Sequence, residues 1–275
     1  MLHRLSEVNG YAIDATDGAV GEVKDFYFDD KAWVVRYLIV DTGGWLSSRK
    51  VLISPIAVGM PNRAQKQLPA SITREEVKNS PDIDTEKPVS RQHEIEYSQH
   101  FGYPFYWGGA GLWGGGLYPN AMLPGQGGFG SPQAERQERE AAYAEADAQR
   151  DDADPHLRSC KVVTGYHIQA TDGEIGHVKD MLFDEETWAI RYLVVDTSNW
   201  WFGHQVLVAP QWISGVNWHD ETVSVDLTRQ AVKDAPVYDP TTELDRQQEI
   251  DIHSHYGRAG YWADSPRRDT DISRV

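Results

Sequence analysis

The sequence has 275 residues, and its 42 acidic side chains outnumber 26 basic ones, which gives a formal net charge of −16. This length suits two domains of ordinary size, and a hydrophobic content of 40% is enough to build folded cores. The excess of acidic residues argues against nucleic acid as a partner, because that binding depends on Lys and Arg side chains that neutralise phosphates.

No apolar run approaches the roughly 20 residues that a membrane-spanning helix needs, so we expect no transmembrane segment. The first seven residues contain no apolar stretch of the kind that begins a secretory signal. The single cysteine, Cys160, cannot form an internal disulfide, which fits a reducing compartment. These features predict a cytoplasmic protein.

Short strands dominate the first part of the chain. Tyr11 to Ala15 is a short extended segment, followed by the turn residues Thr16-Asp17-Gly18. Val20 to Phe28 and Trp33 to Asp41 are rich in β-branched and aromatic residues, which favours two strands of a hairpin. Val51 to Ile53 predicts a further buried strand.

Helices are predicted only after these strands. A weak strand over Ala64 to Ala70 is followed by Thr73 to Asn79, which begins with the capping-box pattern Thr73-Arg74-Glu75-Glu76. A second helix is expected over about Ser90 to His100, and Tyr103 to Trp107 follows as an aromatic tail.

The same order of residues returns 155 positions later without a gap. The repeated segments include Gly10-Tyr11 and Gly165-Tyr166, Val23-Lys24-Asp25 and Val178-Lys179-Asp180, Arg36-Tyr37-Leu38 and Arg191-Tyr192-Leu193, and Tyr106-Trp107 and Tyr261-Trp262. In the second copy, the strand that is weak in the first is clearer, because Thr222 to Leu227 alternates with a period of two. The chain is therefore a tandem duplication of one domain.

The composition changes sharply between the copies. Gly108 to Gly130 is rich in glycine, which predicts a flexible linker, although its aromatic residues could instead form an adhesive patch. A charged, Ala-rich run follows from Ser131 to Arg150. We therefore expect a first domain over 1–107, a Gly-rich and charged linker over 108–155, a second domain over 156–262 and a polar C-terminal tail over 263–275.

Each copy resembles the PRC-barrel family, named for the cytoplasmic domain of the photosynthetic reaction-centre H subunit. The resemblance rests on a Gly before the first strand, an Asp-Gly turn, a Gly-x-Val-x-Asp segment, a hydrophobic strand that ends in Asp, and an apolar strand before Pro. In the first copy these are Gly10, Asp17-Gly18, Gly21 to Asp25, Tyr37 to Asp41 and Val51 to Pro55, and in the second copy Gly165, Asp172-Gly173, Gly176 to Asp180, Tyr192 to Asp196 and Val206 to Pro210. The resemblance implies a mainly β fold of two tandem small barrels with C-terminal helices.

The resemblance also implies a non-catalytic scaffold that binds other proteins, so we expect no enzymatic activity. The H subunit caps a membrane complex, which implies a membrane-bound photosynthetic or electron-transfer complex as partner and a peripheral place at the inner membrane. We expect this chain to differ from the H subunit in having no N-terminal membrane helix. Another relative is an adaptor domain in ribosome maturation, from which this chain departs in its acidity and its two barrels. That adaptor role and an enzyme with an unrecognised pocket remain as alternatives.

Candidate chemical sites are weak in this sequence. The acidic pairs Asp29-Asp30 and Asp184-Glu185 lie in matching hairpin loops, but they offer too few oxygens for a hard cation and are expected to be solvated turn residues. The ten histidines show no zinc-like spacing with a Cys or second His. A lone Cys160 is more often a small buried side chain than a nucleophile. We therefore expect no catalytic residue, no metal and no cofactor.

A hairpin centred between Asp30 and Lys31 would place Asp25 opposite Arg36 and, in the second copy, Asp180 opposite Arg191. The same register pairs Phe28 with Trp33 and Val23 with Leu38. We therefore predict structural ion pairs Asp25–Arg36 and Asp180–Arg191 on the apolar strands.

The repeated aromatic residues are expected mainly in the core or as lids of the barrels, and any that are exposed would mark a protein contact, since aromatic residues dominate interface energetics. The candidate interaction residues are Trp45, Trp107, Trp113, Trp200, Trp201 and Trp262. We also expect the two barrels to associate with each other or with another chain, because tethered like domains have a high effective concentration.

Overall fold

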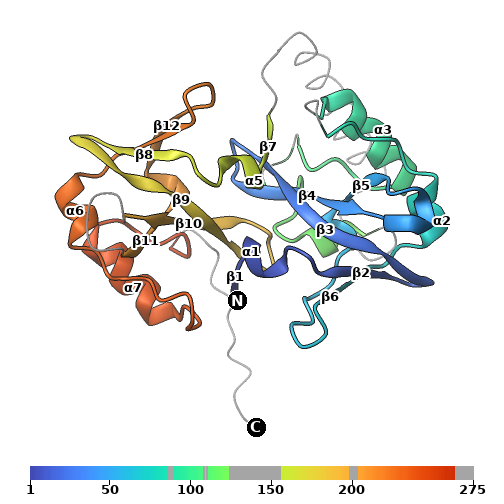
Figure 1. Cartoon of the computed structure of the whole chain (residues 1–275), viewed down its shortest axis with the longest axis horizontal. Coiled ribbons are helices and arrows are strands. Elements are labelled where there is room, and N and C mark those ends of the chain that lie inside the picture. Colours follow the sequence, from blue (N-terminus) through green and yellow to red (C-terminus); the bar gives the residue numbers. More distant parts are fainter. Residues whose placement is uncertain (86–88, 108, 110, 124–155, 198–203, 264–275) are drawn as a thin grey trace.

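The computed structural model describes residues 1–85, 89–107, 109, 111–123, 156–197 and 204–263. Each copy forms one sheet with short helices, and the two sheets meet in the middle of the molecule (Figure 1). The helices that follow each sheet, α2 and α3 in the first copy and α6 and α7 in the second, lie at opposite ends of the molecule (Figure 1).

The first copy contains six strands and its short helices. These are β1 (Leu2–Arg4), α1 (Leu5–Val8), β2 (Ala12–Ala15), β3 (Gly18–Asp29), β4 (Val34–Asp41), η1 (Gly43–Leu46), β5 (Lys50–Ile53), η2 (Pro55–Ala57), β6 (Gln67–Pro69), α2 (Arg74–Lys78), α3 (Arg91–Phe101) and η3 (Pro119–Met122).

The second copy repeats this order and adds one strand. Its elements are β7 (Leu157–Ser159), α5 (Cys160–Val163), β8 (His167–Ala170), β9 (Gly173–Asp184), β10 (Ile190–Asp196), β11 (Gln205–Val208), η4 (Pro210–Trp212), β12 (Ile213–Asn217), β13 (Thr222–Val225), α6 (Arg229–Lys233) and α7 (Arg246–His255).

The predicted strands and helices are confirmed where local patterns were strong. Every residue of β4 except Asp41 is buried, including Arg36 among its apolar neighbours. The capping box of α2 forms between Thr73 and Glu76, and Ser90 caps α3 through the His93 amide. Gly21 is required by close packing, because a Cβ there would overlap the Asp41 carbonyl, and Gly176 meets Asp196 in the same way.

The first sheet has the strand order β5-β4-β3-β2-β6, and the second has β11-β10-β9-β8-β13-β12. Neighbouring strands on these paths are antiparallel except for β2–β6 and β8–β13, which are parallel. Among the described residues, the first and last strands of each path do not pair with each other. The fold is therefore mainly β, as predicted, but each copy forms an open sheet and not a closed barrel.

The two copies exchange their first strands. Strand β1 of the first copy pairs with β9 of the second, and β7 of the second pairs with β3 of the first. The hairpin tips also meet, since the Val35 amide donates to the Trp188 carbonyl (2.9 Å) and the Ile190 amide donates to the Trp33 carbonyl (2.7 Å). The prediction that the barrels associate is confirmed, and the association is a reciprocal exchange of strands.

Part of the Gly-rich segment is packed against the copies, which corrects the prediction of a flexible linker for residues 109 and 111–123. Trp113 is fully buried, and its indole Nε1 donates to the Thr187 carbonyl of the second copy (2.8 Å). Here glycine serves close approach, because a Cβ at Gly111 would overlap the backbone of Gly116. The charged run over 131–150 lies outside the described residues.

Candidate functional site at the junction of the copies

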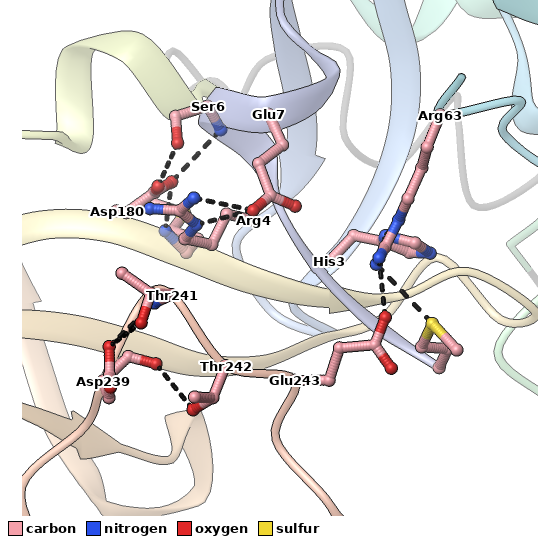
Figure 2. Close-up of polar contacts among 12 residues, drawn as sticks. His3, Arg4, Ser6, Glu7, Arg63, Asp180, Asp239, Thr241, Thr242 and Glu243 are labelled. Atoms are coloured by element: carbon pink, nitrogen blue, oxygen red, sulfur yellow. Dashed lines mark hydrogen bonds and ion pairs between the residues drawn. The ribbon is translucent and has the colours of Figure 1, made fainter. Parts of the chain in front are cut away.

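Two carboxylates join the copies by capping the short helix of the opposite copy. Asp25 on β3 accepts hydrogen bonds from the Ser159 hydroxyl (2.5 Å) and from the Lys161 amide (3.1 Å) at the start of α5. Asp180 on β9 accepts from both the amide and the hydroxyl of Ser6 in α1 (Figure 2). These acids therefore satisfy backbone donors that each helix start would otherwise leave without a partner.

Ion pairs of matching position lie beside these caps. His3 contacts Glu185 (2.6 Å), and Arg158, its equivalent in the second copy, contacts Asp30 (2.9 Å). Arg63 extends the first pair, because it lies against the His3 ring and donates to Glu243 (2.7 Å; Figure 2). The junction is thus held by strand pairing and by charged contacts on both sides of an approximate twofold axis.

The predicted ion pairs Asp25–Arg36 and Asp180–Arg191 are wrong, because the hairpin register differs from the predicted one. Val23 lies opposite Val40, and Asp25 lies opposite Ile39. The main cause is the hairpin loop, which has four residues, 30–33, because Asp29 pairs with Val34, and this moves every pairing by two positions. Bulges at Arg36 and Lys24 then change the register by one further position between them and restore it beyond. The second copy shows the same pattern, with Asp180 opposite Val194.

Each arginine instead pairs with the aspartate that ends the neighbouring strand of the hairpin. Arg36 contacts Asp29 (3.2 Å), and Arg191 contacts Asp184 (3.1 Å). Arg36 is only 3% exposed and also donates to the Leu112 carbonyl (2.5 Å). Its guanidinium stacks on the rings of Tyr106 and Trp113, so it connects the hairpin to the segment after α3.

The pKa shifts differ between the aspartates that cap the opposite copy and the aspartate that pairs with Arg36. Burial raises the pKa of Asp25 and that of Asp180, although the hydrogen bonds from the opposite copy oppose this shift. Burial would raise the pKa of Asp29 too, but the Arg36 charge and the amides of Ala32 and Lys31 outweigh it and hold that pKa below its usual value.

A buried glutamate in each copy was missed by the sequence reasoning. Glu94 on α3 is fully buried and accepts hydrogen bonds from the Tyr106 hydroxyl (2.6 Å) and the Tyr37 hydroxyl (3.2 Å). Arg91 (3.0 Å) and His156 of the second copy (2.6 Å) pair with the same carboxylate. The 155-residue repeat of these residue types was the available signal.

The second copy contains the same arrangement around Glu249. Tyr261 (2.8 Å) and Tyr192 (3.1 Å) donate to its carboxylate, and Arg246 pairs with it (2.8 Å). Burial raises the pKa of Glu249. These hydrogen bonds join α3 to β4 in the first copy and α7 to β10 in the second. Both clusters therefore stabilise the packing of the last helix on the sheet.

The predicted interaction tryptophans have different environments. Trp107 and Trp113 are buried, so they are core residues and the prediction of an exposed contact is wrong for them. Trp45 is partly buried and stacks with Arg74, and Trp262 is partly buried beside His253 and Arg246. Trp200 and Trp201 lie outside the described residues.

A groove of about 450 Å³ lies between the copies. One side is the hairpin loop of the first copy, and the other is β12 with the residues around it in the second copy. The lining residues are Asp30, Lys31, Ala32, Trp33, Pro210, Gln211, Ile213, Ser214, Gly215, Val216 and Trp218. Its volume falls in the range of ligand-binding clefts, and it is absent from the predicted sites.

Comparison with known families identifies the fold. The PRC-barrel domain model matches residues 2–64 and 156–232, just over half of the chain in two segments, so the chain belongs to the PRC-barrel family. No curated protein matches it. Family membership indicates a scaffold or interaction module.

Two further observations describe the site region. No helix in the described ranges is long and apolar enough to cross a membrane. Among the same residues, no three His, Cys, Asp or Glu side chains gather in a way that could hold a metal ion. The acids at the junction are engaged by helix amides, hydroxyls and arginines, so the arrangement is suited to holding two copies in one body.

Proposed function

We propose that this protein is a non-catalytic scaffold that binds a partner protein. The reciprocal exchange of β1 and β7 is the observation that carries the proposal. It fixes two copies of an interaction module in one body, and the junction creates a surface that neither copy has alone.

The finer form of the proposal is an accessory role at a membrane-bound photosynthetic or electron-transfer complex, from the cytoplasmic side of the inner membrane. The family's reaction-centre H subunit motivates this form. A net charge of −16 supports a partner with a basic surface, because the field of the whole chain accelerates association with an opposite charge.

Affinity capture from the native cell tests the proposal. The tagged full chain should retain a defined protein partner from solubilised membranes, with less capture at high salt because exposed charges are screened. Capture of small ribosomal subunits would instead support the adaptor hypothesis. Failure to retain any protein from either membranes or the soluble fraction would contradict the scaffold function.

A further inference from the structure

The groove between the copies runs along the edge of a sheet. Strand β12 is the last strand on the second sheet's path, so in the described part of the chain no strand pairs with its outer edge. Four consecutive residues, 213–216, line the groove. A bulge between Ile213 and Gly215 breaks the regular alternation of side chains, and from Gly215 on the lining residues share the edge of the strand.

The outer edge offers a hydrogen-bond donor and an acceptor at Val216. In the first copy, Asn62 and Gln67 exchange both backbone hydrogen bonds (2.8 and 3.1 Å), and their equivalents Asn217 and Thr222 are paired in the same register. In an antiparallel ladder, hydrogen-bonded pairs alternate with pairs that are not hydrogen-bonded, so Val216 and Val223, the next pair, make no backbone hydrogen bonds to each other. The amide and carbonyl of Val216 therefore point away from β13, toward the groove.

The corresponding place in the first copy is blocked. Pro61 occupies the position of Val216, so the outward N–H is missing there, and Met60 occupies the position of Gly215. Proline on an edge strand is a common protection against strand addition. A Cβ at Gly215 would meet nothing within 4 Å, so the space beside it is open.

We propose that an extended segment of a partner protein binds in this groove and adds a strand to β12. This deepens the proposed scaffold function and rests on it. A bulge between Ile213 and Gly215 limits the regular edge to the three residues Gly215 to Asn217, about 10 Å. Backbone pairing along it supplies affinity, and Trp33 and Trp218 in the lining accept an apolar side chain of the segment.

The charges favour a basic segment. Asp220 and Glu221 are exposed at the turn that ends β12, and the whole chain is acidic. Asp30 is already paired with Arg158, and Lys31 is the exposed cation on the opposite wall. A segment that alternates apolar residues with Lys or Arg, with its basic end beside Asp220 and Glu221, fits these groups.

The test is a selection of random dodecapeptides displayed on phage against the full chain, followed by affinity measurements by fluorescence anisotropy. Val216→Pro removes the outward N–H, as Pro61 does in the first copy, but it also fixes the backbone angle φ and removes a valine side chain that packs against the core. Its melting temperature is therefore measured first and should show that the fold is kept. The substitution should weaken the selected peptides about tenfold, as expected for one lost hydrogen bond. Val216→Thr keeps the N–H and is the matched control, with affinity expected within about twofold.

Hydrogen exchange should show protection at residues 213–217 when a selected peptide is bound, and Gly215→Met should weaken binding by filling the groove. The proposal is overturned if no peptide is enriched, if the peptides lack basic residues, or if they bind Val216→Pro as tightly as the unmutated chain. Repeating the capture from native cells separates the two proposals. A partner retained equally by Val216→Pro refutes the groove but leaves the scaffold function intact, whereas no partner on the unmutated chain refutes the scaffold function itself.

Discussion

Arg36 should be coupled energetically to Asp29 and not to Asp25. The two side chains are 3% and 13% exposed, and their contact is 3.2 Å, whereas Asp25 is engaged by the opposite copy. Removing one partner of such a buried pair leaves an uncompensated charge, which destabilises a protein by about 3–5 kcal/mol.

We expect a loss of about 4 kcal/mol in the free energy of unfolding for Arg36→Ala, because the hydrogen bond to Leu112 and the aromatic stacking are lost as well. Asp29→Ala should lose about 3 kcal/mol and the double variant about 5 kcal/mol, so the coupling is about 2 kcal/mol. The equivalent pair Arg191–Asp184 is 15% and 17% exposed and should show a smaller coupling of about 1 kcal/mol.

The assay is urea unfolding followed by tryptophan fluorescence and circular dichroism for each cycle of variants. Because the copies exchange strands, both probes should report one transition. An Arg36–Asp25 coupling larger than the Arg36–Asp29 coupling would refute the register described here, and additive effects at Arg36 and Asp29 would refute the buried pair.

Three further predictions follow from the junction. Cleavage at a protease site inserted within 124–155 should yield two fragments that still co-elute in size-exclusion chromatography, since β1 and β7 remain exchanged. Separation of the fragments would show that the exchange is too weak to hold the copies together. Trp113→Ala should lower the free energy of unfolding by about 3–5 kcal/mol, and Trp262→Ala, at a partly exposed site, should lower it less; equal effects would show that Trp113 does not pack between the copies. Because burial raises the native pKa of Asp25 and Asp180 above the reference value of 3.8, their contribution to stability is greatest below that pH and is lost as the pH rises through the native pKa values. Unfolding of Asp25→Asn and Asp180→Asn over a pH series should therefore shift in favour of the variants as the pH rises above about 4, and a constant difference would contradict the raised pKa values.

The duplication and the order of elements were accessible from the sequence because they depend on local patterns. Apolar runs such as Tyr37 to Val40 mark buried strands, and Thr73 with Glu76 marks a helix start within one turn of chain. The glycines of the family motif also have a local cause, since Gly21 lies against the Asp41 carbonyl. Repetition at a fixed spacing strengthened each of these signals.

The pairing of charges depended on the tertiary structure. A simple hairpin count placed Asp25 opposite Arg36, but the loop holds four residues, 30–33, and bulges at Arg36 and Lys24 change the register once more between them. Neither the loop length nor the bulges leave a signature in strands of this composition. The repeat marked Glu94 as a recurring residue but did not show what it contacts. Its partners Tyr37, Tyr106 and His156 come from three distant segments that only folding brings together.

By itself, then, the sequence determined that one mainly β domain occurs twice, since strand and helix patterns need only neighbouring residues. Only the tertiary structure decided that β1 and β7 are exchanged and that Trp113 fills the junction. It also showed that no strand of the described ranges pairs with the outer edge of β12, while Pro61 occupies the equivalent place in the first copy. The physical reason is that strand addition uses backbone hydrogen bonds, which nearly every residue can make. The partner of an edge is therefore set by the geometry of the whole chain and not by the side chains along the strand.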